Sequence, residues 1–175
     1  MARNHVQLTQ PNKPKNVKRD PVASGERDAC VNRAASHDFF LLDRYEAGIA
    51  LRGTEVKSIR DGQANLKDSY GLVTNGELFL LNAHIGAYAP GAQFNHDTRR
   101  TRKLLVHHAQ ILKLHAAIQQ KGLTIIPTRM YFKNGRVKVE VAVAKGKQLW
   151  DKRETERRRT ADKEARDAIA RSRKS

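Results

Sequence analysis

Cationic side chains are the residues of this sequence whose types and spacing could do chemistry. Four of them fall within five positions, at Arg99, Arg100, Arg102 and Lys103. Two more, Arg136 and Lys138, alternate with valines in residues 136–144, so the cations share one face of a strand and the valines the other. Such cations neutralise phosphate groups, with an affinity that falls steeply as salt rises. One charged run is usually only a solvated surface, but two runs in a basic chain indicate a polyanionic partner.

The charge of the whole chain supports the same interpretation. The 175 residues carry a formal net charge of +16 at pH 7. The excess is spread over residues 1–36, 37–144 and 145–175, where basic side chains outnumber acidic ones by seven to three, fifteen to nine and twelve to six. RNA, DNA or an anionic membrane would attract this charge. Because neither end has an apolar run or a strongly amphipathic helix, we expect a nucleic acid and no membrane contact.

The histidines and the single cysteine do not form a metal-binding pattern. His107, His108 and His115 lack the i, i+4 spacing of a helical zinc site, and Cys30 has no second cysteine beside it. We therefore expect no metal and no cofactor. Cys30 also cannot form an internal disulfide, and no signal peptide precedes it, so we expect a cytoplasmic protein.

Catalytic patterns are absent as well. The sequence has no glycine-rich phosphate loop and no nucleophile elbow. Glu46, His37 and His96 could form a nuclease-like site only if the fold brings them together. We expect that the protein is not an enzyme.

Two Asn-Gly dipeptides predict the strands that must position these cations. Asn134-Gly135 is typical of a two-residue hairpin turn, so residues 123–132 should pair antiparallel with residues 136–144. Pro127 within the first of these strands requires an edge position or a bulge. Asn75-Gly76 predicts a second hairpin, whose second strand is apolar on both faces, so we expect the next helix to cover one of them.

Glycines mark the other predicted elements. Residues 53–62 resemble a short helix that is capped by Thr54, ends before Gly62 and plugs one end of a barrel. Residues 104–121 form an amphipathic helix that ends at Gly122. Strands at residues 39–42 and 45–51 come first, with a bulge or bend at Gly48.

Together these patterns predict a mainly β fold with α-helices. About six short strands and two or three packed helices favour a small antiparallel OB-type β-barrel at residues 31–147. Residues 1–30 have no apolar cluster to bury, so we expect disorder there. Residues 148–175 form a basic tail whose only large aliphatic residue after Trp150 is Ile169. We expect this tail to be a coil alone and a helix when it lies on a polyanion.

Colinear motifs extend from about residue 32 to residue 153. They include Gly53-Thr54-Glu55-Val56-Lys57-Ser58, Asn65-Leu66-Lys67-Asp68-Ser69-Tyr70, Asn95-His96-Asp97, Arg99-Arg100-Thr101-Arg102-Lys103-Leu104-Leu105, Ala144-Lys145-Gly146-Lys147 and Asp151-Lys152-Arg153. In this order, and with little insertion, the sequence resembles the SsrA-binding protein (SmpB) family of bacteria, the partners of transfer-messenger RNA (tmRNA, or SsrA RNA).

The resemblance implies a ribosome-rescue function. A member of this family binds the tRNA-like domain of tmRNA through an OB-type barrel and brings it to stalled ribosomes for trans-translation, which tags nascent peptides for degradation. Alanyl-tRNA synthetase and elongation factor Tu are partners through the tmRNA complex. The tail of the family lies as a helix in the empty mRNA channel, against small-subunit rRNA. We expect a monomer that catalyses no reaction.

The resemblance also implies site residues. Glu46, Leu105 and Lys138 match tmRNA-binding positions of the family, with Asn32 and His37 beside them. Together with the cations, the candidate RNA-binding residues are Asn32, His37, Glu46, Arg99, Arg100, Arg102, Lys103, Leu105, Lys133, Arg136 and Lys138. The candidate ribosome-binding residues of the tail are Lys145, Lys147, Trp150, Asp151, Lys152, Arg153, Arg157 and Arg158.

Two positions depart from the family pattern. Trp150 stands where relatives more often have Tyr or His, which keeps an aromatic face for stacking on an rRNA base but loses their hydrogen-bonding group. Thr98 stands where Pro is common, which should loosen the entry to the basic loop. The alternative to tmRNA binding is a general rRNA-binding OB-fold protein or an initiation-factor-like module.

Overall fold

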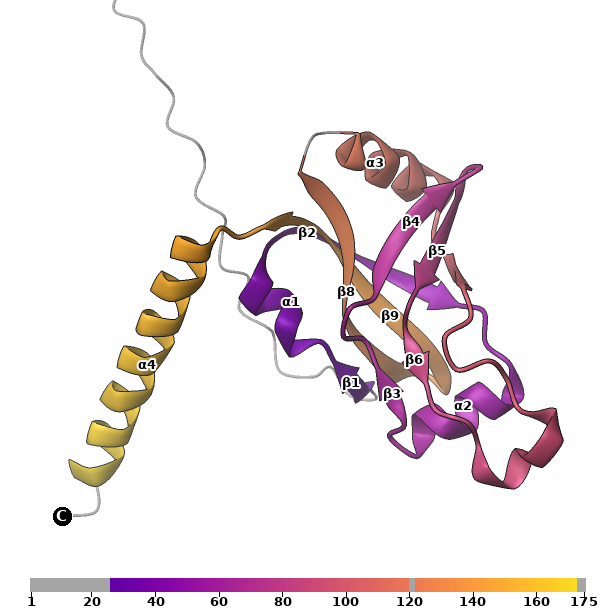
Figure 1. Cartoon of the computed structure of the whole chain (residues 1–175), viewed down its shortest axis with the longest axis horizontal. Coiled ribbons are helices and arrows are strands. Elements are labelled where there is room, and N and C mark those ends of the chain that lie inside the picture. Colours follow the sequence, from indigo (N-terminus) through magenta and orange to yellow (C-terminus); the bar gives the residue numbers. More distant parts are fainter. Residues whose placement is uncertain (1–25, 120–121, 173–175) are drawn as a thin grey trace, which may run out of the picture.

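A computed structural model describes residues 26–119 and 122–172 of the chain (Figure 1). Its strands are β1 (Glu26–Val31), β2 (Phe39–Ile49), β3 (Ala64–Asn65), β4 (Tyr70–Thr74), β5 (Glu77–Leu81), β6 (His84–Ile85), β7 (Arg102–Leu105), β8 (Leu123–Lys133) and β9 (Arg136–Gly146). Its helices are α1 (Arg33–Asp38), α2 (Gly53–Arg60), the 3-10 helix η1 (Ala89–Phe94), α3 (His108–Ile118) and α4 (Leu149–Ser172). The fold is mainly β, as predicted, and its strands pair antiparallel.

Both predicted hairpins are confirmed. Asn75 and Gly76 have φ angles of 52° and 73°, and Asn134 and Gly135 have φ angles of 50° and 74°. Two successive positive φ angles are the signature of a type I′ turn, whose twist matches that of the flanking strands. The first turn joins β4 to β5, and the second joins β8 to β9 in one long ladder.

Strand irregularities occur at one predicted place and at one unpredicted place. The β8–β9 register shifts between Pro127 and Arg129, where the proline predicted a bulge. In β2 the register shifts between Leu41 and Arg44, and the expected bulge at Gly48 is wrong. A glycine is needed at position 48 for another reason, because β7 passes close to it. A Cβ atom on Gly48 would lie 3.3 Å from the Cβ atom of the Leu105 side chain.

The strand pairings form a closed cycle. They run from β8 through β4, β5, β7, β2 and β9 and then return to β8, while β1 pairs with the second half of β8. The link between β4 and β8 is the single pair Gly71–Ile125. A Cβ atom on Gly71 would lie 2.6 Å from the Ile125 side chain, so only glycine allows this approach. The small strands β3 and β6 pair separately.

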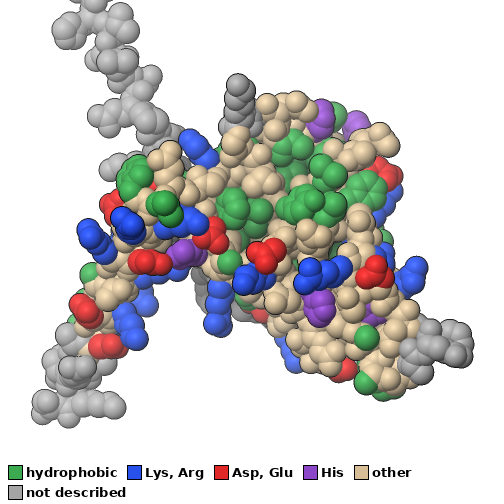
Figure 2. All heavy atoms as spheres, in the orientation of Figure 1, with side chains coloured by type: hydrophobic (Ala, Val, Ile, Leu, Met, Phe, Trp, Pro, Cys, Tyr) green, Lys and Arg blue, Asp and Glu red, His purple; other side chains and the backbone are tan. Residues whose placement is uncertain are grey.

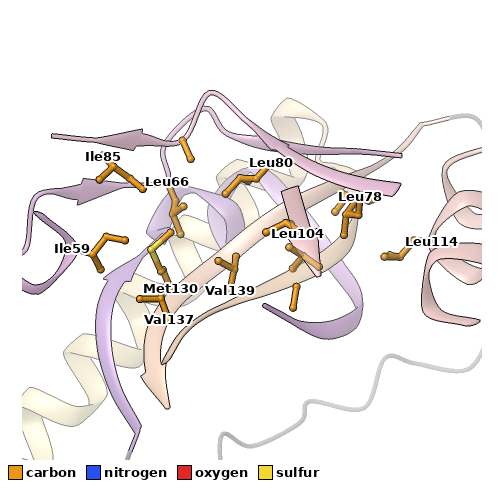
Figure 3. Close-up of a cluster of buried hydrophobic side chains, with 14 of the residues drawn as sticks. Ile59, Leu66, Leu78, Leu80, Ile85, Leu104, Leu114, Met130, Val137 and Val139 are labelled. Carbon is orange, nitrogen blue, oxygen red and sulfur yellow. The ribbon is translucent and has the colours of Figure 1, made fainter. Parts of the chain in front are cut away.

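The enclosed space holds one hydrophobic core (Figure 3). The valines predicted to point inward from β9 are buried, and they pack with leucines of β5 and β7 and with Met130 of β8. Ile59 of α2 and Leu114 of α3 enter the core at opposite ends. The two helices therefore cover the ends of the sheet enclosure. Helix α2 packs against the core as expected, but its N-cap is Arg52 and not Thr54.

The ordered region begins earlier than predicted. Residues 26–30, which we expected to be disordered, belong to β1. This strand pairs with β8 from Glu26–Lys133 to Val31–Arg129. Its stability comes from that ladder and from ion pairs of Arg129 with Glu26 and Asp28, which a search for apolar residues does not detect. Residues 1–25 lie outside the described residues, so the disorder expected there stays a prediction.

The predicted helix at residues 104–121 also needs correction. Residues 102–105 form β7, and α3 begins only at His108. In β7 the side chains of Arg102 and Leu104 point inward, while those of Lys103 and Leu105 are exposed. The apolar residues of β7 repeat every two positions, and those of α3 repeat about every 3.6 positions. Because the two segments adjoin in the sequence, their apolar residues were taken for one helical pattern.

An apolar strip lies on the outer face of β4 and β5. Tyr70 pairs with Leu81, and Leu72 pairs with Phe79. We expected the next helix to cover this face, but α3 packs its Leu114 into the core, and Tyr70 and Leu72 stay 38% and 43% exposed. Figure 2 shows hydrophobic side chains gathered over β4, β5 and β8.

The tail is helical in this structure, where we expected a coil in the chain alone. Helix α4 is rich in Arg, Lys, Glu and Ala, which favour helices even without a core. Asp151 lies in its first turn and accepts a 3.1 Å hydrogen bond from the backbone N–H of Gln148. The first half of α4 also contacts α1, which stabilises an ordered start of the tail.

Candidate nucleic-acid interface

Strand pairing brings the three principal candidate residues together. Gly48 of β2 pairs with Leu105 of β7 on one side and with Lys138 of β9 on the other. Glu46 lies two residues before Gly48 in β2, on the same face of the strand. One open groove of about 420 Å³ is lined by Glu46, Gly48, Leu105, Val106, His107, Gln110 and Lys138. We refer to it as the central groove.

Glu46 is the electrostatic centre of the groove. Its carboxylate accepts hydrogen bonds of 2.6 Å from the Tyr131 hydroxyl and 2.9 Å from Lys133 Nζ, and Lys138 Nζ lies 3.5 Å away. The hydrogen bonds from Tyr131 and then Lys133 lower the pKa of Glu46 to about 2. Burial, followed by the bond to Glu46, raises the pKa of Tyr131. The result is a fixed carboxylate beside two lysines whose ammonium groups it orients.

The exposed atoms in the central groove and beside it suit a nucleic acid. Lys133 and Lys138 have side chains that are 39% and 30% exposed, so their ammonium groups can contact phosphate. Leu105 is 54% exposed and offers an apolar contact to a sugar or base. Arg136 lines an adjoining groove together with Leu105 and Lys138, which extends the cationic surface towards the β8–β9 turn.

The basic segment 99–103 does not form one cationic surface. Arg102 has no exposed side-chain area, so the expectation of a surface cation there is wrong. Its Nε donates a 2.8 Å hydrogen bond to Glu55, and its Nη1 donates a 2.7 Å hydrogen bond to the Ala83 carbonyl. Although burial raises the pKa of Glu55, hydrogen bonds from Arg100, from the backbone N–H of Arg52 and from Arg102 outweigh it and lower this pKa.

The remaining cations of this segment differ in what they contact. Arg100 donates a 2.5 Å hydrogen bond to Glu55 and is 23% exposed. Lys103 forms an ion pair with Glu77 across β5 and β7, on the exposed face. The backbone of Arg99 is held by Asp97, which leaves Arg99 at an exposed turn. Arg99 and Lys103 are therefore the surface cations of the segment, and Arg100 and Arg102 hold α2 to the sheet.

Asn32 has a role inside the fold. Its Nδ2 donates hydrogen bonds of 3.1 Å and 3.0 Å to the carbonyls of Leu66 and Pro127, and its Oδ1 caps α1 by accepting from the backbone N–H of Ala35. Only 9% of the residue is exposed. Asn32 therefore positions α1 and does not line the central groove.

The three residues considered for a nuclease site contact different groups. Both ring nitrogens of His37 contact carboxylates, those of Asp38 and Glu156. His96 is buried, with contacts of 3.0 Å to Thr54 Oγ1 and 3.1 Å to the Ile85 carbonyl. Glu46 lies in the central groove instead. Among the described residues, His, Cys, Asp and Glu side chains do not cluster in threes that could hold a metal ion.

The tail residues extend from the end of β9 along α4. Trp150 is 63% exposed, and its Nε1 donates a 2.9 Å hydrogen bond to Gln148. Lys147 and Lys152 turn towards α1, where they contact the Ser36 carbonyl and Asp38. Lys145, Arg153, Arg157 and Arg158 lie on exposed positions. Of the helices that the structure describes, none is both long and apolar enough to cross a membrane.

Tyr131 is a candidate site residue that the sequence analysis did not select. It is almost completely buried, yet its hydroxyl reaches Glu46. The signal that could have found it is the two-residue turn at Asn134-Gly135, which fixes the pairing of Tyr131 with Lys138. Counting back from the turn places the phenol beside a predicted RNA-binding lysine.

The closed sheet, the central groove with Lys133 and Arg136 beside its Lys138, and the basic helical tail define a nucleic-acid-binding β protein. Within this class, the model of the SmpB protein family matches residues 29–171. The chain belongs to the SmpB family.

Individual relatives agree with this assignment. The chain is 77% identical over 162 residues to the SsrA-binding protein of Koribacter versatilis, with 93% of each chain covered. It is 52% identical to the SsrA-binding protein of Geobacter sulfurreducens, which covers 86% of this chain and 99% of the relative. A solved structure described as "tmRNA-SmpB: a journey to the center of the bacterial ribosome" matches with a TM-score of 0.61 and 44% identity, covering 73% of this chain and 94% of the other.

Proposed function

We propose that this protein is a ribosome-rescue factor that binds the tRNA-like domain of tmRNA and brings it to stalled ribosomes for trans-translation. The observation that carries the proposal is the convergence of Glu46, Leu105 and Lys138 from three strands in the central groove. The family resemblance points to the same three residues. The relatives named SsrA-binding protein support the same function.

In this proposal each residue in or beside the groove makes a different type of contact with the RNA. Lys133 and Lys138 neutralise phosphates, and Leu105 packs on a nucleotide. Glu46 holds the two ammonium groups in place and can accept hydrogen bonds from a base amino group or a ribose 2′-hydroxyl. Tyr131 fixes the carboxylate, since its hydroxyl contacts one of the two oxygens.

The proposed organisation has a body and a tail. We interpret the closed cycle of six paired strands as an OB-type barrel, and we place the body at residues 26–147. Residues 148–175 form the tail, which lies in the empty mRNA channel of the small ribosomal subunit. There Trp150 stacks on an rRNA base, while Arg153, Arg157 and Arg158 contact phosphates.

The partners follow from this role. The protein acts in the cytoplasm as a monomer and without catalysis or a cofactor. Alanyl-tRNA synthetase and elongation factor Tu engage it through the tmRNA complex, because both recognise the tRNA-like domain that it holds.

Sequencing of the RNA that co-purifies with the protein tests the proposal. The expected result is one dominant RNA that is tmRNA. Bulk rRNA without enriched tmRNA would contradict the proposal and favour a general rRNA-binding protein. Washing at increasing salt removes non-specifically bound RNA first, since that binding is almost purely electrostatic.

A further inference from the structure

Glu26, at the start of β1, contacts a lysine beside the central groove. In the β1–β8 ladder it is directly opposite Lys133, so the two side chains share one face of the sheet. Glu26 Oε1 lies 3.2 Å from Lys133 Nζ, and Glu26 Oε2 lies 3.5 Å from Nη2 of Arg129. Only 17% of the Glu26 side chain is exposed. Its carboxylate is therefore held in place between two cations.

Lys133 is in turn shared between two carboxylates. Its ammonium group donates a 2.9 Å hydrogen bond to Glu46 and contacts Glu26 on its other side. These contacts with Glu46 and then with Glu26 raise the pKa of Lys133, which keeps it protonated. Because an ammonium group has three N–H donors, the two contacts leave one donor for an RNA phosphate. They also fix a side chain that is otherwise among the most flexible in proteins.

The charged side chains around Lys133 cancel one another. The ion pairs that connect to it contain four cations and four carboxylates, namely Arg44, Arg129, Lys133 and Lys138 with Glu26, Asp28, Glu46 and Glu140. Arg136, in the adjoining groove, adds one positive charge. An RNA that is attracted by charge alone therefore gains little at this surface, because each connected cation already faces a carboxylate.

We propose that Glu26 is a specificity-determining residue, which weakens the attraction of Lys133 for RNA in general and orients its ammonium group for one phosphate of the correct RNA. The inference rests on the proposed binding of the tRNA-like domain of tmRNA in the central groove. Non-specific binding is almost purely electrostatic, so the negative charge of Glu26 weakens it. An RNA whose shape fits the groove recovers that loss, because an ammonium group that is already oriented loses little freedom on binding.

Asp28 provides a matched control on the same strand. It lies two residues after Glu26 on the same face of β1 and pairs with the same Arg129, at 3.1 Å. Among the ion pairs of the described residues, Asp28 contacts Arg129 and not Lys133. Glu26→Gln and Asp28→Asn therefore remove the same charge and weaken the same contact with Arg129, but only Glu26→Gln changes the surroundings of Lys133.

The test measures the affinity of the full-length protein for two RNAs, the tRNA-like domain of tmRNA and a polyuridylate of equal length. We expect Glu26→Gln to bind polyuridylate about threefold more tightly, in keeping with the loss of one partly exposed ion pair. Its affinity for the tRNA-like domain should stay the same or fall. The preference for the tRNA-like domain should therefore fall by about threefold or more, and Asp28→Asn should change it by less than about 1.5-fold.

A double-mutant cycle tests whether Glu26 acts through Lys133. In a Lys133→Gln background, Glu26→Gln should no longer change the preference between the two RNAs, because no ammonium group remains to be shielded or oriented. Thermal unfolding of each variant gives the contribution to the fold. A role in the fold alone would lower the unfolding temperature of both Glu26→Gln and Asp28→Asn and leave the preference unchanged.

The outcomes separate this inference from the function on which it rests. If Glu26→Gln leaves the preference unchanged, or changes it equally with and without the lysine at position 133, the role of Glu26 is wrong. If the unmodified protein binds the tRNA-like domain no better than polyuridylate, the proposed binding of tmRNA is itself wrong.

Discussion

The Tyr131 hydroxyl donates a 2.6 Å hydrogen bond to Glu46 across an intervening strand. Tyr131 belongs to β8 and Glu46 to β2, and β9 lies between them. Two strand spacings amount to about 10 Å, which only two long side chains can bridge. Lys138 lies on the middle strand, directly opposite Tyr131 in the ladder. The hydrogen bond therefore fixes a carboxylate beside the lysine that we propose as a phosphate contact.

The pKa of Glu46 makes its contribution to stability dependent on pH. Since the folded pKa is lowered from 4.5 to about 2, the ionised carboxylate stabilises the fold above pH 4.5, and this is lost as pH falls towards 2. The side chain is 40% exposed, so solvent screening leaves about 1 kcal/mol. Urea unfolding of Glu46→Gln should show that deficit at pH 7 and a smaller one at pH 3. An equal deficit at both pH values would contradict the assigned cause.

Replacing Glu55 by the similarly sized glutamine should cause a large loss in the free energy of unfolding. The Glu55→Gln change leaves the buried guanidinium of Arg102 without its counter-ion, and breaking a buried ion pair costs about 3–5 kcal/mol. The matched control is Glu77→Gln, which removes the exposed pair with Lys103 and should cost less than about 1 kcal/mol. Denaturant unfolding of both variants gives the comparison. Similar losses would mean that the Glu55 cluster does not stabilise the fold.

His37 should titrate above its usual range. Hydrogen bonds to Glu156 and then to Asp38 raise its pKa. The protonated ring therefore stabilises the α1–α4 contact fully below pH 6.5, and this stabilisation is lost as pH rises through the raised pKa. Lys152, which pairs with Asp38, and Arg159, which contacts Ser36, are the cations of α4 that face α1 here. NMR titration of the ring should show a lower pKa in Glu156→Gln and no change in Glu164→Gln. If Glu156→Gln leaves the pKa of His37 unchanged, the His37 and Glu156 side chains are not in contact in solution.

Truncation separates the proposed roles of body and tail. A chain that ends at Lys147 keeps the central groove and the contacts of Lys147 with α1, so its affinity for tmRNA should fall by no more than a few-fold, through the weaker non-specific component. Tagging on stalled ribosomes should be lost. Measured on the same preparation, a parallel loss of tmRNA binding would make the tail part of the tmRNA interface. Unimpaired tagging would remove its role in the mRNA channel.

Local signals predicted much of the fold. The Asn75-Gly76 and Asn134-Gly135 turns are encoded by residues that tolerate positive φ angles, and the alternating valines of β9 point to the core whatever the partner strand is. Strand β1 was not predictable in this way, because its residues are polar and its stability depends on pairing with β8, about 100 positions away.

The site was predictable in part for the same reason. The family resemblance selected Glu46, Leu105 and Lys138, and strand pairing brings them into one groove. The cation at Arg102 was misjudged because a charge run does not show which side chains point inward. Only the position of Glu55 on α2 decides that Arg102 is buried.

The central claim is that the groove around Lys138 binds tmRNA, and the salt dependence of binding by two single-charge variants tests it most directly. Lys138→Gln and Lys163→Gln remove the same charge, one from the groove and one from the tail helix. We expect Lys138→Gln to weaken tmRNA binding about fivefold to tenfold, equivalent to about 1–1.4 kcal/mol. It should also reduce the slope of log affinity against log salt by about one phosphate contact, with Lys163→Gln unchanged in both. Equal effects of the two variants, or no effect of Lys138→Gln, would contradict the account.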